Sequence, residues 1–291
     1  MNSQQSFEHN KLGKLYLVPT PIGNLDDMTF RSIDVLKMVD LIAAEDTRHT
    51  QKLLNHFDID TKMISFHEHN TQERIPELLN QLTEGQSLAQ VSDAGTPSIS
   101  DPGTELVKAA VEQGFIVIPL PGANAAVPAL IASGIVPQPF YFHGFLPRSK
   151  NDLKAMLEEL NQKTETMIFY ESPHRLKKTL EQMQSIFGEE RKIVLARELT
   201  KKYEEFIRGN LKELLFWVKD NQIRGEFVII VEGNPTPEMV EKDDTWLAWS
   251  EKEHVEKIMA EKNLRSKVAI KEVAVIRDVP KRQIYAAYHE I

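Results

Sequence analysis

Residues 91–103 combine the side chains and the turn-forming residues best suited to holding a ligand. They read VSDAGTPSISDPG, with glycines, prolines, aspartates and hydroxyl residues close together. Glycine lets the backbone approach a ligand closely, and small hydroxyl groups donate and accept hydrogen bonds. An apolar run, 87–91, precedes the segment as an expected strand, and an amphipathic helix is expected over 104–113. Ligands of open α/β sheets bind beyond the carboxyl ends of strands, so we predict a ligand-binding loop, the alternative being a long ordered connection.

Residues 45–48, which read EDTR, directly follow the expected strand 41–44. Four polar groups at the carboxyl end of a strand indicate a functional site. An equally good alternative is the start of a helix capped by Asp46 or Thr47. The sequence leaves both interpretations open.

His67, Glu68 and His69 follow the expected third strand, 62–66. Two histidines and a carboxylate are metal ligands in many proteins, but no third His or Asp stands at a useful spacing. We therefore predict no metal site and expect these residues to line a cleft.

Two further loops offer glycine and proline at the ends of apolar runs. Residues 19–24 end the first expected strand, 13–18, and their two prolines stiffen the loop. Asp26 or Asp27 is expected to cap the helix that follows. Residues 121–127 read PGANAAV and bring a ligand close to the amides of a helix N-terminus.

These loops need a scaffold, and strands alternate with helices up to residue 120. That alternation predicts a parallel sheet covered on both faces. Residues 134–139 resemble a linker, after which further strands are expected at 166–170, 193–196 and 226–231. The predicted organisation is a flexible N-terminus (1–12), two α/β domains (13–120 and 121–235) and a tail (245–291).

The tail has the pattern of three helices, expected over 250–262, 266–277 and 281–288. A short turn separates the last two, and the final helix carries Lys281 and Arg282. This arrangement resembles a helix-turn-helix. The alternative is a small three-helix cap that packs on the body.

Composition limits the class of protein. The 291 residues include no cysteine and carry a formal charge of −8, with 41% apolar residues. The missing cysteines exclude disulfides and thiol catalysis and favour a cytoplasmic protein. The acidic charge argues against broad nucleic-acid binding, although the tail is mildly basic. Neither a membrane span nor a secretory signal is predicted.

Several motifs in order resemble one family, the ribosomal small-subunit RNA 2′-O-ribose cytidine methyltransferases of the tetrapyrrole methylase superfamily. The motifs are the segments 17–25, 44–48, 91–103, 169–175 and 197–201. The resemblance extends from residue 13 to about residue 234. Tetrapyrrole-modifying members begin with a Gly-x-Gly loop, whereas this chain has Pro-Thr-Pro, which favours the RNA branch. The tail resembles a helix-turn-helix appendage of some members.

The resemblance implies two αβα domains with mostly parallel sheets that form a cleft for S-adenosylmethionine, plus the small C-terminal helical module. It also implies a homodimer. Carried over motif by motif, the cofactor contacts fall on Pro21, Ile22, Gly23, Gly95, Thr96, Ser98, Ile99, Asp101, Asn124, Ala125 and Tyr170.

Methyl transfer to a ribose hydroxyl requires a group that takes its proton. Glu45 and Glu171 are the first choices for this base, with Asp46 and His174 as further candidates. No metal is required. For the phosphates of 16S rRNA in the small ribosomal subunit, the candidates are Arg48, Arg148, Arg175 and Lys201. Platforms on which bases stack are expected at Phe66, Tyr141 and Phe142.

Three other functions remain open on sequence grounds. A tetrapyrrole-type small-molecule methyltransferase would share the cofactor site but needs an apolar, enclosed acceptor cavity. A diphthamide-type protein methyltransferase is a more distant relative. A non-enzymatic RNA-binding ribosome-assembly factor would not bind S-adenosylmethionine.

Overall fold

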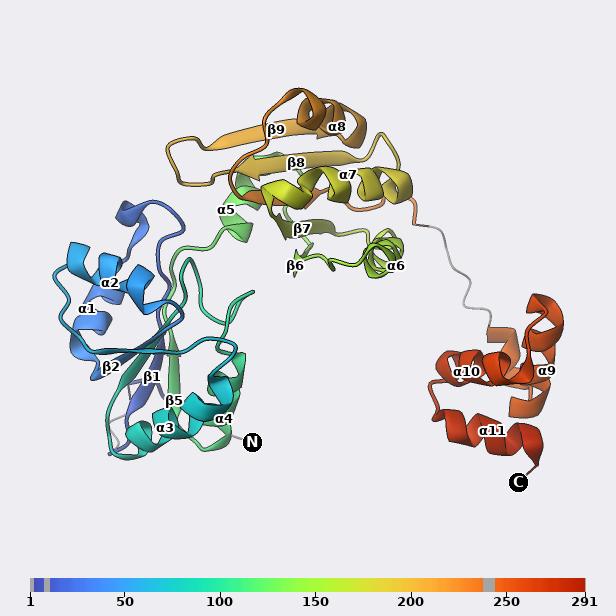
Figure 1. Ribbon diagram of the computed structural model, residues 1–291, viewed down its shortest axis with the longest axis horizontal. Coiled ribbons are helices and arrows are strands. Elements are labelled where there is room, and N and C mark those ends of the chain that lie inside the picture. Colours follow the sequence, from blue (N-terminus) through green and yellow to red (C-terminus); the bar gives the residue numbers. More distant parts are fainter. Residues whose placement is uncertain (1–2, 8–10, 238–243, 291) are drawn as a thin grey trace. The chain divides into compact units, whose positions relative to one another are not determined.

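The computed structural model describes residues 3–7, 11–237 and 244–290 (Figure 1). The chain divides into two compact units, Met1–Pro237 and Glu238–Ile291. The first unit holds two five-stranded sheets and the second is helical. Within the described residues, no helix has both the length and the apolar character needed to cross a bilayer.

The first sheet is parallel throughout, as the alternation of strands and helices predicts. Its strand order is β3-β2-β4-β1-β5, and every pairing between neighbours is parallel. All its carboxyl ends therefore meet at one edge. The strands are β1 (Lys14–Leu17), β2 (Leu41–Ala44), β3 (Met63–Ser65), β4 (Leu88–Val91) and β5 (Ile116–Pro119).

Helices cover both faces of this sheet (Figure 1). One apolar core joins the sheet to α1 (Phe30–Met38) and α2 (Thr47–His56). A second core joins the opposite face to α3 (Thr71–Thr83) and α4 (Thr104–Glu112). Burial of both faces explains why the strands are almost continuously apolar.

The expected cap of the first helix is wrong. Asp26 and Asp27 lie in a short 3₁₀ helix, Leu25–Asp27, whose first turn is capped by Asn24. The helix α1 begins after Thr29, whose hydroxyl accepts a hydrogen bond from the Ser32 amide. The cap of α2 is Asp46, one of the two residues proposed for it.

Edge strand β5 is met by the N-terminal segment. The Gln4 side chain accepts a hydrogen bond from the Val117 amide at 2.9 Å and donates one to the Val117 carbonyl at 2.8 Å. A side-chain amide thus makes the two bonds that another strand would make.

The second sheet is mixed rather than mostly parallel. Its order is β6-β7-β10-β8-β9, and only the β6–β7 pairing is parallel. The central strand β10 thus runs against both of its neighbours. The strands are β6 (Phe140–Phe145), β7 (Thr166–Glu171), β8 (Lys192–Arg197), β9 (Glu205–Asn210) and β10 (Phe227–Val231).

Helices also pack on both faces of the second sheet. The larger core includes residues of α6 (Lys150–Leu160), α7 (Pro173–Phe187) and α8 (Leu211–Asp220). The smaller core uses α5 (Ala126–Ser133) on the other face. Pro173 opens α7, as its position predicts.

The second unit contains the three predicted helices, α9 (Glu251–Lys262), α10 (Ser266–Ile276) and α11 (Lys281–His289), after a short 3₁₀ helix, Asp244–Ala248. They enclose their own apolar core, which includes Val255, Ile270 and Ile284. Arg277 donates to the carbonyls of Trp246 and Trp249 and so ties the end of α10 to the start of the unit.

Candidate functional site

The three glycine- and proline-containing loops of the first sheet are bonded to one another. Thr20 and Gly95 exchange two backbone hydrogen bonds of 2.9 Å, which join loop 19–24 to loop 92–103. The Thr96 hydroxyl donates to the Ala123 carbonyl at 3.0 Å and joins the long loop to the third loop. The three loops therefore form one surface at the carboxyl edge of the sheet.

Glycine is required at two positions of the long loop. At Gly95, φ is +85°, and a Cβ would lie 3.3 Å from the Ile22 side chain. At Gly103, φ is +135°, and a Cβ would lie 1.6 Å from the Gln90 Nε2 atom. That nitrogen donates to the Pro102 carbonyl and braces the end of the loop. Any larger residue at position 103 would displace this brace.

The backbone of the long loop is strained beside Ile99. Ser98 and Ser100 have φ values of +68° and +62°, in the left-handed region that residues other than glycine rarely adopt. Such conformations persist only where the surrounding structure enforces them, and they cluster at functional sites. The Ile99 side chain between them lines a cavity and is 43% exposed.

This central cavity has a volume of about 430 Å³ and takes its walls from both sheets. Among the residues predicted to hold a cofactor, those lining it are Ile22, Gly95, Thr96, Ile99, Asp101, Asn124, Ala125 and Tyr170. Pro21, Gly23 and Ser98 do not line it. Glu171 and Lys201, assigned other roles from the sequence, do.

Sequence reasoning missed the wall formed by the second sheet near Phe227. Because β10 is antiparallel to β7 and β8, its first residue, Phe227, lies opposite Glu171 and Arg197, at the carboxyl ends of those strands. The amino end of β10 therefore lies beside the carboxyl ends of β7 and β8 and contributes to the same site. Ala196, Leu199 and Val228 complete this apolar wall.

Hydrogen bonds from neighbouring residues fix the Glu171 carboxylate in place. It is 3% exposed, and its two carboxylate oxygens accept hydrogen bonds from the Ser172 amide at 2.8 Å and the Thr179 hydroxyl at 2.6 Å. The Arg175 Nε atom lies 3.5 Å from the same carboxylate. Arg175 also donates to the carbonyls of Leu146 and Pro147. Both charged groups are thus engaged inside the protein.

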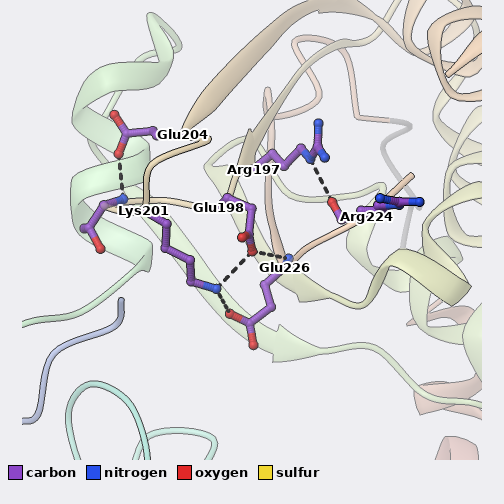
Figure 2. Close-up of polar contacts among 7 residues, drawn as sticks. Arg197, Glu198, Lys201, Glu204, Arg224 and Glu226 are labelled. Atoms are coloured by element: carbon purple, nitrogen blue, oxygen red, sulfur yellow. Dashed lines mark hydrogen bonds and ion pairs between the residues drawn. The ribbon is translucent and has the colours of Figure 1, made fainter. Parts of the chain in front are cut away.

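Lys201 lies between two carboxylates, as Figure 2 shows. Its Nζ atom is 2.9 Å from Glu198 Oε1 and 2.8 Å from Glu226 Oε2. Burial by itself would lower the pKa of Lys201. The hydrogen bonds to the two carboxylates outweigh this effect, so the pKa of Lys201 is raised. A Cβ at Gly23 would lie 2.4 Å from Lys201 Cγ, so this glycine lets the lysine pack against the first loop.

A second cavity of about 620 Å³, here called the acidic cavity, also borders the long loop. Its lining includes Glu45, His67, His69, Ser98 and Asp101. This places the two histidines in a cavity wall, as expected. Within the described residues, no group of three His, Asp or Glu side chains has the arrangement of a metal site.

The carboxylates around the acidic cavity repel one another. Burial, together with the charges of Glu45 and Asp93, raises the pKa of Asp101 from 3.8 to about 7, with Ser92 opposing the shift. Burial also raises the pKa of Glu45. Glu45 accepts a hydrogen bond from the Asp93 amide, and Asp93 accepts one from the Asp46 amide. Burial and neighbouring negative charge therefore favour the protonated forms of Glu45 and Asp101.

The predicted phosphate-binding cations differ in exposure and in the groups that they bind. The Arg48 side chain is 89% exposed and binds the Asp46 carboxylate, whose pKa it lowers to about 2. Arg148 is exposed just before α6. Arg175 and Lys201 are engaged as described above.

One predicted stacking platform is wrong. Phe66 is 1% exposed and belongs to the core under α3 and α4, so no base can reach it. Tyr141 has Lys163 Nζ 4.2 Å from its ring centre, and Phe142 packs against Tyr170. Phe66 follows β3 directly, and the alternation of a strand does not show which face is buried.

Comparison with known proteins places the chain among methyltransferases. The family model for tetrapyrrole (corrin/porphyrin) methylases matches residues 14–215. The chain is 55% identical over 290 residues to "Ribosomal RNA small subunit methyltransferase I" of Bacillus subtilis, covering 99% of each chain. A protein of the same name from Halalkalibacterium halodurans is 55% identical over all of both chains.

Solved structures of lower identity share the fold. A diphthine synthase matches with a TM-score of 0.59 at 13% identity, over 76% of this chain and 90% of that one. A uroporphyrin-III C-methyltransferase from Thermus thermophilus, solved with S-adenosylhomocysteine, matches with a TM-score of 0.53 at 15% identity, over 76% and 97% of the two chains. At these identities, both likenesses show the overall fold alone.

Proposed function

Because the chain belongs to the tetrapyrrole methylase family, in the branch of the ribosomal RNA small subunit methyltransferases I, we propose that it methylates the 2′-hydroxyl of a cytidine ribose in 16S rRNA. The full-length identity to relatives of that name supports methylation of small-subunit ribosomal RNA, and the resemblance of the sequence motifs supports the cytidine 2′-hydroxyl as the acceptor. S-adenosylmethionine is the methyl donor of this reaction. We also propose that the protein acts in the cytoplasm, because its proposed substrate is ribosomal RNA.

The central cavity fits this donor. Its volume lies within the usual range for small-molecule sites, roughly 300–1,000 Å³. Gly95 leaves room where a Cβ would crowd Ile22, and Ile22, Ile99 and Leu199 offer apolar surface. We assign donor binding to Ile22, Gly95, Thr96, Ile99, Asp101, Asn124, Ala125 and Tyr170, with Pro21, Gly23 and Ser98 shaping the loops. S-adenosylmethionine supplies an electrophilic methyl group.

The exposed cations and the tail are assigned to the RNA. Arg48 and Arg148 are exposed at the surface, although Arg48 also binds Asp46. Arg48 lines a groove of about 710 Å³ with Gln51 and Lys62. Phosphates attract such cations, and the guanidinium offers a bidentate fork. In this assignment Arg175 and Lys201 act on the RNA only through the loops that they hold.

We also propose that the chain forms a homodimer through the apolar outer face of α5. Val127 and Ile131 are one helical turn apart and are 47% and 73% exposed. Val136 and Phe140 continue the exposed apolar surface beyond the helix. A second copy of the chain would bury side chains that otherwise face water.

The test is a tritiated-methyl assay on small ribosomal subunits from a strain that lacks the gene. Label is expected in a ribose of a cytidine and is expected to resist removal of the base. Label in a base would overturn the assigned acceptor. Calorimetry with S-adenosylmethionine tests the donor separately, and absence of binding to the folded protein would overturn the assignment of the cavity.

A further inference from the structure

The loop between β8 and β9, residues 198–204, contributes to the central cavity and also reaches solvent. Leu199 and Lys201 line the cavity. The next two residues, Lys202 and Tyr203, are exposed, and Tyr203 is 67% exposed. The Lys202 Nζ atom lies 5.6 Å from the centre of the Tyr203 ring. The loop thus presents an aromatic ring and a cation beside the cavity assigned to the methyl donor.

The backbone of this loop is fixed in a strained conformation. Glu198 and Thr200 have φ values of +50° and +67°, in the left-handed region that a β-branched residue such as threonine rarely adopts. Lys201 binds Glu198 and Glu226, and Glu204 accepts a hydrogen bond from the Thr200 amide at 2.7 Å (Figure 2). Because these bonds hold the loop in place, its exposed ring is already ordered before a partner binds, which lowers the entropic cost of binding.

Two cations at this loop have no acidic partner. Within the part of the chain that the structure describes, the side chains of Lys202 and Arg224 form neither an ion pair nor a hydrogen bond, and both residues are exposed. Arg224 lies beside the loop, because its carbonyl accepts a hydrogen bond of 2.7 Å from Arg197 Nε (Figure 2). The carboxylates of the same network are bonded within the protein. The two cations are therefore available to an anionic partner.

We propose that loop 198–204 binds the RNA strand next to the target cytidine, with the Tyr203 ring stacked on an unpaired base and with Lys202 and Arg224 on phosphates. This inference rests on the proposed function. Unpaired bases of RNA stack on aromatic rings, and phosphates bind lysine and arginine.

The position of the loop favours RNA as its occupant. The methylated nucleotide must reach the donor, whereas the nucleotides on either side of it stay outside the cavity. Leu199 and Lys201 belong to the cavity wall, so the exposed residues that follow them are within reach of such a neighbouring nucleotide. A second copy of the chain is the alternative occupant, and the experiment separates the two.

The stacking platforms expected from the sequence are less accessible than Tyr203. Phe66 is buried, and Phe142 packs against Tyr170 with 5.1 Å between the ring centres. Tyr141 is only partly exposed, and its ring carries the Lys163 ammonium group. These rings already have partners in the protein.

The experiment measures the binding of small ribosomal subunits, taken from a strain that lacks the gene, to Tyr203→Ala. The Kd for subunits is expected to rise about 10-fold, within the range for one base stacked on an aromatic ring. The Kd for S-adenosylmethionine should be unchanged, since Tyr203 does not line the cavity. Tyr203→Trp keeps a stacking surface and is expected to bind subunits as the wild type does. Phe216→Ala, which removes a ring on α8 that is 68% exposed, is the matched control and should change neither Kd.

The salt dependence tests the two cations. Lys202→Ala and Arg224→Ala are each expected to reduce the slope of log Kd against log salt by about one, whereas Tyr203→Ala should leave the slope unchanged.

Wild-type affinity of Tyr203→Ala for subunits, or an equal loss in Tyr203→Trp, would overturn the proposed stacking. Conversion of Tyr203→Ala to a monomer in light scattering would overturn it in favour of a contact between two copies of the chain. Failure of the wild-type protein to label any ribose would instead refute the proposed function.

Discussion

At the scale of single residues, ionisation of the Asp101 carboxyl destabilises the folded protein. Its pKa is about 7 in the folded protein and near 3.8 in an unfolded chain, so between these values the folded state binds more protons. The free energy of unfolding therefore falls as the pH rises through this window.

Asp101→Asn is accordingly expected to stabilise the protein at about pH 8. The side chain is partly exposed, so after discounting for solvent screening the gain is about 1–2 kcal/mol. At about pH 4 the gain should be small, since the folded carboxyl is already neutral. Urea denaturation at both pH values measures the gain in stability, and an equal gain at the two pH values would contradict the raised pKa of Asp101. Glu112→Gln, which alters an exposed carboxylate on α4, should change little at either pH.

Gly103→Ala is expected to destabilise strongly. The new Cβ would meet the Gln90 amide in a backbone conformation that alanine avoids, at a cost of about 2 kcal/mol or more. Gly114→Ala is the matched control, because Gly114 also has a positive φ, +79°, but nothing lies within 4 Å of its Cβ. Its cost should be about 1 kcal/mol. If urea denaturation showed equal losses of stability for Gly103→Ala and Gly114→Ala, the contact with Gln90 would not contribute to stability.

At the scale of elements, the first half of the site was predictable and the second half was not. Continuous apolar strands and alternating helices define a parallel sheet, whose carboxyl ends must share an edge, so loops 19–24, 91–103 and 121–125 could be brought together from sequence. The direction of β10 depends on pairing with β7 and β8, which its apolar run does not encode. Phe227 was missed for that reason.

Strand β9 was missed for a related reason. Its residues Phe206 and Ile207 are only partly buried, and polar residues surround them, so the segment has little pattern of its own. Six register pairs with β8 define it. The position of Asp101 in the walls of both cavities could not be predicted either, since it depends on the path of a loop strained at Ser98 and Ser100.

The apolar face of α5 provides a prediction at this scale. Ile131→Glu places a charge on the proposed dimer surface and is expected to give a monomer in light scattering after size-exclusion chromatography. Val111→Glu, which alters an apolar side chain on α4 that is 47% exposed, should leave the dimer intact. A monomeric wild-type protein, or a dimeric Ile131→Glu variant, would place the homodimer elsewhere or exclude it.

At the scale of the whole molecule, the two units have separate apolar cores. A chain that ends at Pro237 is therefore expected to fold and to bind S-adenosylmethionine as the full chain does. The tail presents exposed Lys267, Lys271, Lys281 and Arg282. Their loss should weaken subunit binding about 10-fold and make its dependence on log salt shallower. An unchanged salt slope would favour a tail without RNA contacts.

The Gln4 side chain affects the tendency of the protein to aggregate. An uncovered edge strand is a template on which another chain can add a strand, the usual start of aggregation. By occupying the Val117 amide and carbonyl, Gln4 blocks that template with a single residue. Gln4→Ala is expected to leave catalysis intact, while turbidity develops at a lower temperature on heating. In this interpretation the Gln4 side chain protects the protein from aggregation.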